Sequence, residues 1–125
     1  MKHNLNLILR KSINEQNSAY EKVEVKRFEK LLSEIKSCWI KKRNIYICGN
    51  GGSAGNANHI ANDFLYGVGK KNKKGIRIES LSANSSVLTC LANDIGYEKV
   101  YSEQLRVKGN PGDLLIVLSG SGNSK

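Results

Sequence analysis

Residues 44–53 read NIYICGNGGS, an apolar run that ends in a glycine-rich turn. The run predicts a buried strand over residues 45–48, and the residues after it predict a helix from 53 to about 66. A strand that passes through a glycine turn into a helix exposes backbone N–H groups at the helix start, where the helix dipole also attracts anions. The segment therefore predicts a phosphate-binding turn, with Ser53 at the N-cap of the helix.

A second apolar run with a polar turn behind it lies at residues 113–124, which read DLLIVLSGSGNS. It predicts a strand over residues 114–118. In a parallel sheet both turns would lie at the carboxyl edge, where open α/β sheets bind ligands. Any one serine could simply cap a helix, but hydroxyls on two converging turns suit one phosphate group: Ser53, Ser119, Ser121 and Ser124. Neither turn matches a P-loop or a dinucleotide-binding fingerprint.

Strands alternate with helices along the rest of the sequence after residue 43. Apolar residues at every second position predict a strand over residues 76–81. Helices are expected over residues 85 to about 92, with Ser85 or Asn84 as the cap, and over 97 to about 108. Residues 110–112, which read NPG, predict a turn before the last strand. This alternation predicts an α/β fold with a parallel sheet and right-handed crossovers.

Residues 1–43 are expected to form two helices, with a break or a cap at Asn17 and Ser18. The second helix has an apolar stripe at helical spacing, and the first has apolar residues four positions apart: Phe28, Leu31, Leu32, Ile35 and Trp39, then Leu5, Leu9 and Ile13. These helices could cover a face of the sheet or pack against copies of themselves.

Length and charge limit the classes of function that remain open. The chain has 125 residues, enough for one small domain, and a formal net charge of +9. A basic chain attracts nucleic acid, anionic membranes or phosphorylated substrates. The cations here are mostly spread out, and no aromatic residues alternate with them to stack on bases. We therefore expect a phosphorylated substrate and neither nucleic acid nor a membrane as a partner.

The cysteines and the chain ends indicate the compartment and the extent of the domain. Cys38, Cys48 and Cys90 show no metal-ligand spacing and lie in apolar runs, so we expect buried, reduced thiols in a cytoplasmic protein. No stretch has the pattern of a signal peptide or a membrane span. The sequence stops at Lys125, directly after the second turn. We expect the front part of a larger domain, and the alternative is a complete small domain.

Two polar pairs could carry chemistry. His59 and Asp63 are four residues apart on the predicted helix, which places both on one face. An imidazole and a carboxylate could bind a divalent metal or share a proton transfer, and the alternative is an ordinary surface pair. Asn93 and Asp94 follow the helix after the second strand, near the same edge, and could equally mark the end of that helix.

These motifs, GNGGS at 49–53 with His59 downstream, NDIGY at 93–97 and SGSGNS at 119–124, together resemble the sugar isomerase (SIS) domain. More narrowly, they resemble the phosphoheptose isomerase family. The resemblance implies a flavodoxin-like parallel sheet flanked by helices, and a homotetramer whose core is built partly by the N-terminal helices. Residues 1–43 would then be an oligomerisation segment, and residues 44–125 the N-terminal part of a phosphosugar-binding domain.

The resemblance also implies roles for individual residues. The serines of both turns would hold the substrate phosphate, and Gly120 between two of them would also bind substrate. Other residues would line the sugar site: Asn50, Gly51, Gly52, Asn93 and Asp94. His59 matches a zinc ligand. Asp63 stands where the family usually has a glutamate that binds zinc and moves protons, and its carboxylate reaches less far. Gly120 replaces the usual threonine, and the family's other zinc ligands, a glutamine and a histidine, are not in this chain.

The function that follows is isomerisation of sedoheptulose 7-phosphate to D-glycero-D-manno-heptose 7-phosphate, in heptose biosynthesis. Asp63 would be the base, zinc would polarise the carbonyl, and the chain alone is expected to be inactive or nearly so. A non-catalytic SIS adaptor, such as a replication-initiator-associating protein, is the alternative, although an acid at position 63 favours the enzyme. A SIS-type transcription regulator would need a helix-turn-helix domain, for which residues 1–43 are too few. An inert truncated product is the remaining possibility.

Overall fold

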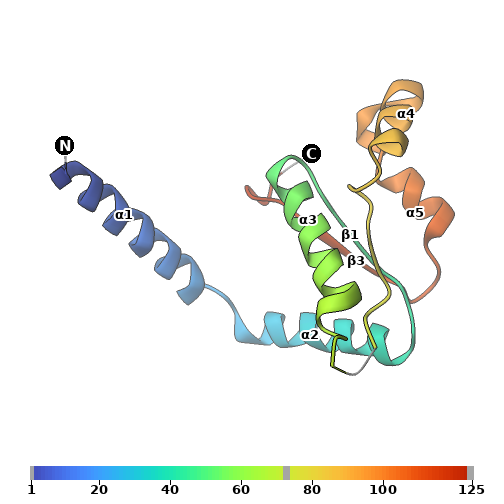
Figure 1. Ribbon diagram of the computed structural model, residues 1–125, viewed down its shortest axis with the longest axis horizontal. Helices are drawn as coiled ribbons and strands as arrows, with labels where there is room; N and C mark the ends of the chain where they lie inside the picture. The colour runs from blue at the N-terminus through green and yellow to red at the C-terminus, as the bar shows by residue number, and fades with distance from the viewer. Residues whose placement is uncertain (1, 72–73, 124–125) are drawn as a thin grey trace. The chain divides into compact units, whose positions relative to one another are not determined.

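A computed structural model describes residues 2–71 and 74–123, with side chains from residue 4 onward (Figure 1). The chain forms two compact units, residues 1–33 and residues 34–125. Helix α2 (Val25–Ile40) contributes its first residues to the first unit and its last turns to the second.

The first unit contains α1 (Lys2–Glu21) and the start of α2. The predicted break at Asn17 and Ser18 is wrong, because both residues lie inside α1 and the helices separate at residues 22–24. Asn and Ser cost only a few tenths of a kcal/mol in a helix interior, roughly, so the rest of the helix can carry them. The leucine and isoleucine side chains of α1 are all more than half exposed: Leu5, Leu7, Ile8, Leu9 and Ile13.

The second unit is built on a sheet of three parallel strands in the order β2-β1-β3. They are β1 (Ile45–Gly49), β2 (Ile78–Ser80) and β3 (Leu114–Leu118). Ile45 of β1 pairs with Ile78 on one side and with Leu114 on the other, and Gly49 pairs with Leu118. The parallel α/β fold is as predicted, although the second strand is shorter than the expected 76–81.

Helices flank the sheet and follow the predicted alternation, with two differences. The elements are α3 (Gly52–Asn62), a π-helical turn η1 (Asp63–Gly67), α4 (Ser85–Ile95), a 3₁₀ turn η2 (Tyr97–Lys99) and α5 (Ser102–Lys108). The helix expected over 53–66 therefore changes to π geometry at Asp63. The helix expected over 97–108 consists of the 3₁₀ turn η2 and the α-helix α5, which residues 100–101 separate. The Asn84 side chain caps α4 by accepting from the Val87 N–H at 3.1 Å, one of the two predicted caps.

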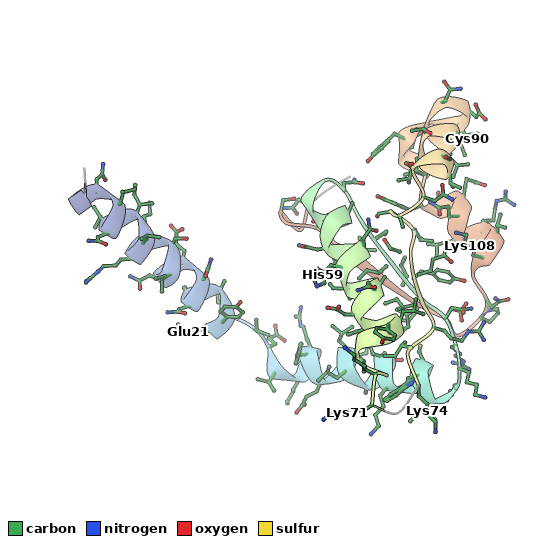
Figure 2. All side chains as sticks on the ribbon, in the orientation of Figure 1. Glu21, His59, Lys71, Lys74, Cys90 and Lys108 are labelled. Atoms are coloured by element: carbon green, nitrogen blue, oxygen red, sulfur yellow. The ribbon has the colours of Figure 1, made fainter. Side chains whose placement is uncertain are left out.

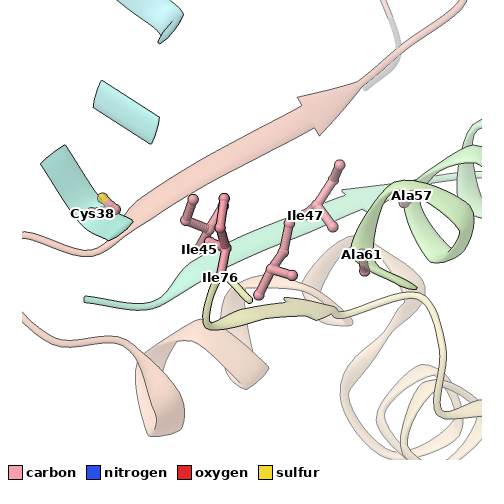
Figure 3. Packing of buried hydrophobic residues seen from close by; sticks show 7 residues of the cluster. Cys38, Ile45, Ile47, Ala57, Ala61 and Ile76 are labelled. Carbon is pink, nitrogen blue, oxygen red and sulfur yellow. The ribbon is translucent and has the colours of Figure 1, made fainter. Parts of the chain in front are cut away.

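Side chains alternate across β1 because successive strand residues point to opposite faces. Ile45 and Ile47 pack on one face, in a cluster with residues of α2, α3, β2 and the segment before β2: Cys38, Ala57, Ala61, Ile78 and Ile76 (Figure 3). Tyr46 and Cys48 pack on the other face with Leu81, next to Tyr101 and Leu105. The middle strand is buried throughout, since both of its faces are covered.

The starts of β1 and β3 are joined by the carboxylate of Asp113. It accepts the Asn44 N–H at 2.9 Å, the Asn44 carboxamide at 3.3 Å and the Asn110 N–H at 2.9 Å. Burial raises the pKa of Asp113, but these hydrogen bonds and the charge of Arg77 outweigh it, so that the pKa lies below its ordinary 3.8. The predicted turn at 110–112 is present, closed by a hydrogen bond from the Asp113 N–H to the Asn110 carbonyl.

The expectation for the cysteines holds for two of the three. Cys38 and Cys48 are buried and free, whereas Cys90 is exposed on α4. An apolar neighbourhood in sequence misled the prediction, because no residue of α4, a helix the structure describes in full, is buried. Within the described part of the chain, no helix is long and apolar enough to span a membrane.

Candidate functional site

A cleft with a volume of about 640 Å³ opens where β1 and β3 end. Its lining comes from α3 and from the end of β3 with the turn that follows: Ser53, Asn56, His59, Ile60, Val117, Leu118, Ser119 and Gly120. The structure thus brings Ser53 of the first turn and Ser119 of the second to one cavity. Both serines are partly buried, and His59 lies on the outer side of α3 (Figure 2).

Gly49 allows the two turns to come this close. A Cβ atom at Gly49 would lie 2.6 Å from the Ser53 Cβ and 2.9 Å from the Leu118 carbonyl oxygen. Real Cβ atoms do not tolerate such contacts, and one of the two partners is backbone. The last residue of β1 therefore has to be glycine for Ser53 and the end of β3 to share one cavity.

Ser53 does not cap its helix, so the predicted N-cap is wrong. The N-cap is Gly51, which has φ of 55°, and α3 begins at Gly52. A positive φ suits glycine, and this lets the helix start earlier than the serine. The Ser53 Oγ makes no hydrogen bond to any residue within 4–71 or 74–123. This hydroxyl lines the cleft without a structural partner of its own.

The hydroxyls of the second turn help to shape that turn. Ser119 Oγ accepts the Gly122 N–H at 3.0 Å, and Ser121 Oγ accepts the Asn123 N–H at 3.1 Å. Gly120 lines the cleft beside Ser119, while Ser121 is exposed and is not among the lining residues of the described chain. Ser124, the fourth predicted phosphate ligand, lies outside the described residues.

His59 and Asp63 form the predicted pair on one face of the helix. The His59 Nε2 lies 3.1 Å from the Asp63 Oδ2, and both side chains are more than half exposed. An imidazole nitrogen and a carboxylate oxygen are donors that zinc accepts, so the pair fits as part of a zinc site. A zinc ion takes four ligands, and residues 2–71 and 74–123 hold no group of three or more His, Cys, Asp or Glu side chains arranged for a metal.

Asn93 and Asp94 lie at the exposed end of α4, and neither is among the cleft-lining residues that the structure describes. The Asn93 carboxamide donates to Asp94 Oδ1 at 2.9 Å, and the Cys90 thiol lies 3.5 Å from Asp94 Oδ2. The hydrogen bond to Asp94 raises the pKa of the Cys90 thiol. The structure therefore joins Asp94 to Cys90 and does not place it against the two turns.

Three hydroxyls that we did not single out from the sequence hold the first turn. Ser82 Oγ accepts the Gly49 N–H at 3.2 Å and donates to the Gly49 carbonyl at 2.9 Å. The Tyr101 hydroxyl donates to the same Gly49 carbonyl oxygen at 2.6 Å, and the Tyr97 hydroxyl donates to Asn50 Oδ1 at 3.0 Å. The sequence offered no clear signal for this pair, because Tyr97 begins η2 and Tyr101 precedes α5, so the two side chains do not share one regular helix.

Gly51 and Gly52 start α3, and a Cβ atom on either would meet no described atom within 4 Å. Their exposed backbone leaves room for a ligand at the helix start. The Tyr101 phenol that holds the first turn has a raised pKa. Burial raises this pKa above its ordinary 10.0, and the hydrogen bond with Ser82 lowers it by a smaller amount. The phenol therefore stays protonated at neutral pH and remains a hydrogen-bond donor to the turn.

Comparison with known proteins gives consistent results. The family model of the SIS domain matches residues 10–125. A curated phosphoheptose isomerase of Helicobacter pylori strain P12 is 52% identical over 81 residues, which cover 65% of this chain and 42% of the relative. One from Alteromonas mediterranea is 37% identical over 97 residues, covering 78% and 48%. The chain thus spans somewhat less than half the length of these relatives.

Two solved structures share the fold. The phosphoheptose isomerase GmhA of Neisseria gonorrhoeae superposes with a TM-score of 0.83 at 32% identity, covering 98% of this chain and 62% of that one. A phosphoheptose isomerase of Francisella tularensis has a TM-score of 0.86 at 21% identity, covering 97% and 62%. At this lower identity the likeness concerns the fold alone.

Proposed function

The chain belongs to the SIS-domain family, and on that premise we propose that it carries the phosphosugar site of an isomerase that converts sedoheptulose 7-phosphate to D-glycero-D-manno-heptose 7-phosphate. The observation that carries this proposal is the meeting of Ser53 and Ser119 in one cleft. A serine hydroxyl that caps nothing and faces a cleft at a helix start is suited to donate to a phosphate oxygen.

Phosphate binding would hold the sugar in place while the reaction proceeds at the other end of the molecule. The hydroxyls of Ser53 and Ser119, with the N–H groups at the start of α3, would grip the phosphate and supply orientation. Ser121 and Ser124 complete the proposed phosphate ligands, and Gly120 beside Ser119 is a further substrate-binding residue. The proposed sugar site consists of Asn50, Gly51, Gly52, Asn93 and Asp94. With such anchoring, we expect the reaction to require the phosphate ester.

Proton transfer is assigned to Asp63. Its carboxylate would take a proton from C1 of the ketose, next to the C2 carbonyl, leaving an enediolate. A proton then returns to C2, and the proton of the C1 hydroxyl moves to the C2 oxygen. The C1 oxygen becomes the aldehyde and the C2 oxygen the hydroxyl, so the reaction balances. Asp63 directly follows α3, the helix that carries Ser53 and His59, and its carboxylate lies 3.1 Å from the imidazole of His59, which lines the cleft; this position supports the role. Asp63 acts here as a general base.

His59 and Asp63 are the proposed zinc ligands within this chain. When bound, zinc would polarise the substrate carbonyl. The pair supplies two donors of the right kind, so zinc held by this chain alone should bind weakly. Zinc titration followed by the NMR signals of the His59 ring tests this, and Asp63→Ala should weaken the response. Equal zinc uptake by both forms would contradict the assignment.

Ligand-induced stabilisation of this chain tests the function. Sedoheptulose 7-phosphate at 100 times its Kd should add about 2.7 kcal/mol to the free energy of unfolding, and thus raise Tm by roughly 10 °C. Sedoheptulose without phosphate is the control and should give little shift, because it lacks the anchored group. If no sugar phosphate raises Tm, the isomerase proposal fails and a non-catalytic adaptor is favoured.

We further propose a homotetramer in the cytoplasm. The support for assembly is the exposed apolar face of α1, since such faces on a helix usually mark a contact surface. The free, buried thiols of Cys38 and Cys48 suit a reducing compartment. Sedimentation equilibrium should give four times the monomer mass of 13.8 kDa, and a monomer at all concentrations would contradict this assembly.

A further inference from the structure

The carboxamide of Asn50 is held by two phenols from another part of the chain. Tyr97 of η2 donates to Asn50 Oδ1 at 3.0 Å. The Tyr101 hydroxyl is also 3.0 Å from Asn50 Oδ1 and 2.6 Å from the Gly49 carbonyl, so that it shares one proton between two acceptors. The oxygen of the Asn50 side chain is thereby engaged from two sides.

The nitrogen of the same side chain has no such partner. Among residues 4–71 and 74–123, no group accepts a hydrogen bond from Asn50 Nδ2. The side chain is exposed and follows directly on β1, at the same edge of the sheet as the cleft, although Asn50 is not among the described residues that line it. With its oxygen occupied, the carboxamide presents a donor to whatever binds there.

We propose that Tyr97 and Tyr101 are positioning residues, which fix the Asn50 carboxamide so that its nitrogen donates to an oxygen of the sugar part of the bound phosphosugar. This inference rests on the proposed function, which already places Asn50 in the sugar site, and adds to it the two residues that orient the Asn50 side chain. An amide with an ordered orientation binds without first losing rotational freedom. The hydroxyls of the two tyrosines, which are not among the cleft-lining residues, hold the Asn50 amide in this orientation.

The fold itself has little need of the Tyr97 contact. Tyr97 is 59% exposed, and within the described chain its hydroxyl bonds to Asn50 and to no other group. Tyr101 differs, because its hydroxyl also holds the Gly49 carbonyl and contacts Ser82. Tyr97→Phe therefore separates positioning of Asn50 from support of the backbone, whereas Tyr101→Phe changes both.

Tyr46 provides a matched control. Its hydroxyl donates to the Lys108 carbonyl at 2.7 Å, away from the cleft, so that Tyr46→Phe also removes one phenol hydrogen bond. The experiment compares wild type, Tyr97→Phe, the Tyr97→Phe/Tyr101→Phe double variant and Tyr46→Phe. Two quantities are measured for each: the NMR-detected mobility of the Asn50 side-chain amide without ligand, and the Kd for sedoheptulose 7-phosphate and for inorganic phosphate.

We expect the Asn50 amide to become mobile in Tyr97→Phe and more so in the double variant. The Kd for sedoheptulose 7-phosphate should rise about fivefold in Tyr97→Phe, as for one lost neutral hydrogen bond, and by about twentyfold or more in the double variant. The Kd for inorganic phosphate should stay unchanged in Tyr97→Phe, because the proposed phosphate ligands are the serines and do not include Asn50. Tyr46→Phe should match wild type in both measurements.

Different failures point to different errors. An Asn50 amide that stays as rigid in both tyrosine variants as in wild type overturns the positioning inference, whatever binds. An equal rise in both Kd values in Tyr97→Phe also overturns it, because that result means general loosening of the turn. If wild type binds inorganic phosphate but no sugar phosphate, the proposed function is overturned instead.

Discussion

Replacement of Gly49 by alanine should lower the free energy of unfolding of the 34–125 unit by about 3 kcal/mol, the upper part of the usual range for overpacking. The added methyl would lie 2.6 Å from the Ser53 Cβ and 2.9 Å from the Leu118 carbonyl oxygen. Neither atom can swing away like the end of a long side chain, because one is backbone and the other is fixed to it. The strain has to be relieved by moving the two turns apart.

Gly55→Ala is the matched control, because it makes the same chemical change a few residues further on. Gly55 lies inside α3, and a Cβ there would meet no described atom within 4 Å. This replacement should stabilise the protein by about 0.5–1 kcal/mol, since alanine favours a helix interior. Urea unfolding of both variants provides the measurement. Equal stability of Gly49→Ala and wild type would show that the two turns do not need their close approach.

The second large effect is expected from removing the hydroxyls of the cleft. Ser53→Ala/Ser119→Ala should raise the Kd for sedoheptulose 7-phosphate by about 100-fold or more, because each hydrogen bond to a charged group contributes roughly 1.5–3 kcal/mol. Ser53→Ala alone should raise the Kd about tenfold with unchanged stability. Stability should not change in Ser53→Ala because Ser53 Oγ has no hydrogen-bond partner among the described residues. Ser119 Oγ, in contrast, accepts the Gly122 N–H.

Calorimetric titration together with urea unfolding separates binding from stability in this series. Ser102→Ala serves as the control, because the Ser102 hydroxyl donates to the Lys99 carbonyl and lies outside the cleft. It should leave the Kd unchanged. If Ser53→Ala binds the sugar phosphate as tightly as wild type does, the hydroxyl is not a phosphate ligand, and the anchoring step of the proposed mechanism is wrong.

Local chemistry explains why most of the elements were predictable and some of their ends were not. Apolar runs bounded by glycine predicted β1 and β3, and Asn84 was one of the two predicted caps of α4. The start of α3 depended instead on the backbone angles of Gly51, which the residue type permits but does not impose. The exposure of Cys90 likewise depends on the position of α4 in the fold. The apolar residues next to Cys90 in the sequence do not indicate this position.

The amino-acid sequence by itself determined the alternation of strands and helices, the two turns at strand ends, and the pairing of His59 with Asp63. These features depend on residues that are close together in the sequence, so the spacing of residue types along the chain is enough to predict them. Tertiary structure alone decided that Ser53 and Ser119 share a cleft, and that phenols of residues 97 and 101 hold the turn at Asn50. Those contacts join segments far apart in the chain, and they depend on strand order and on the space left by a missing Cβ at Gly49.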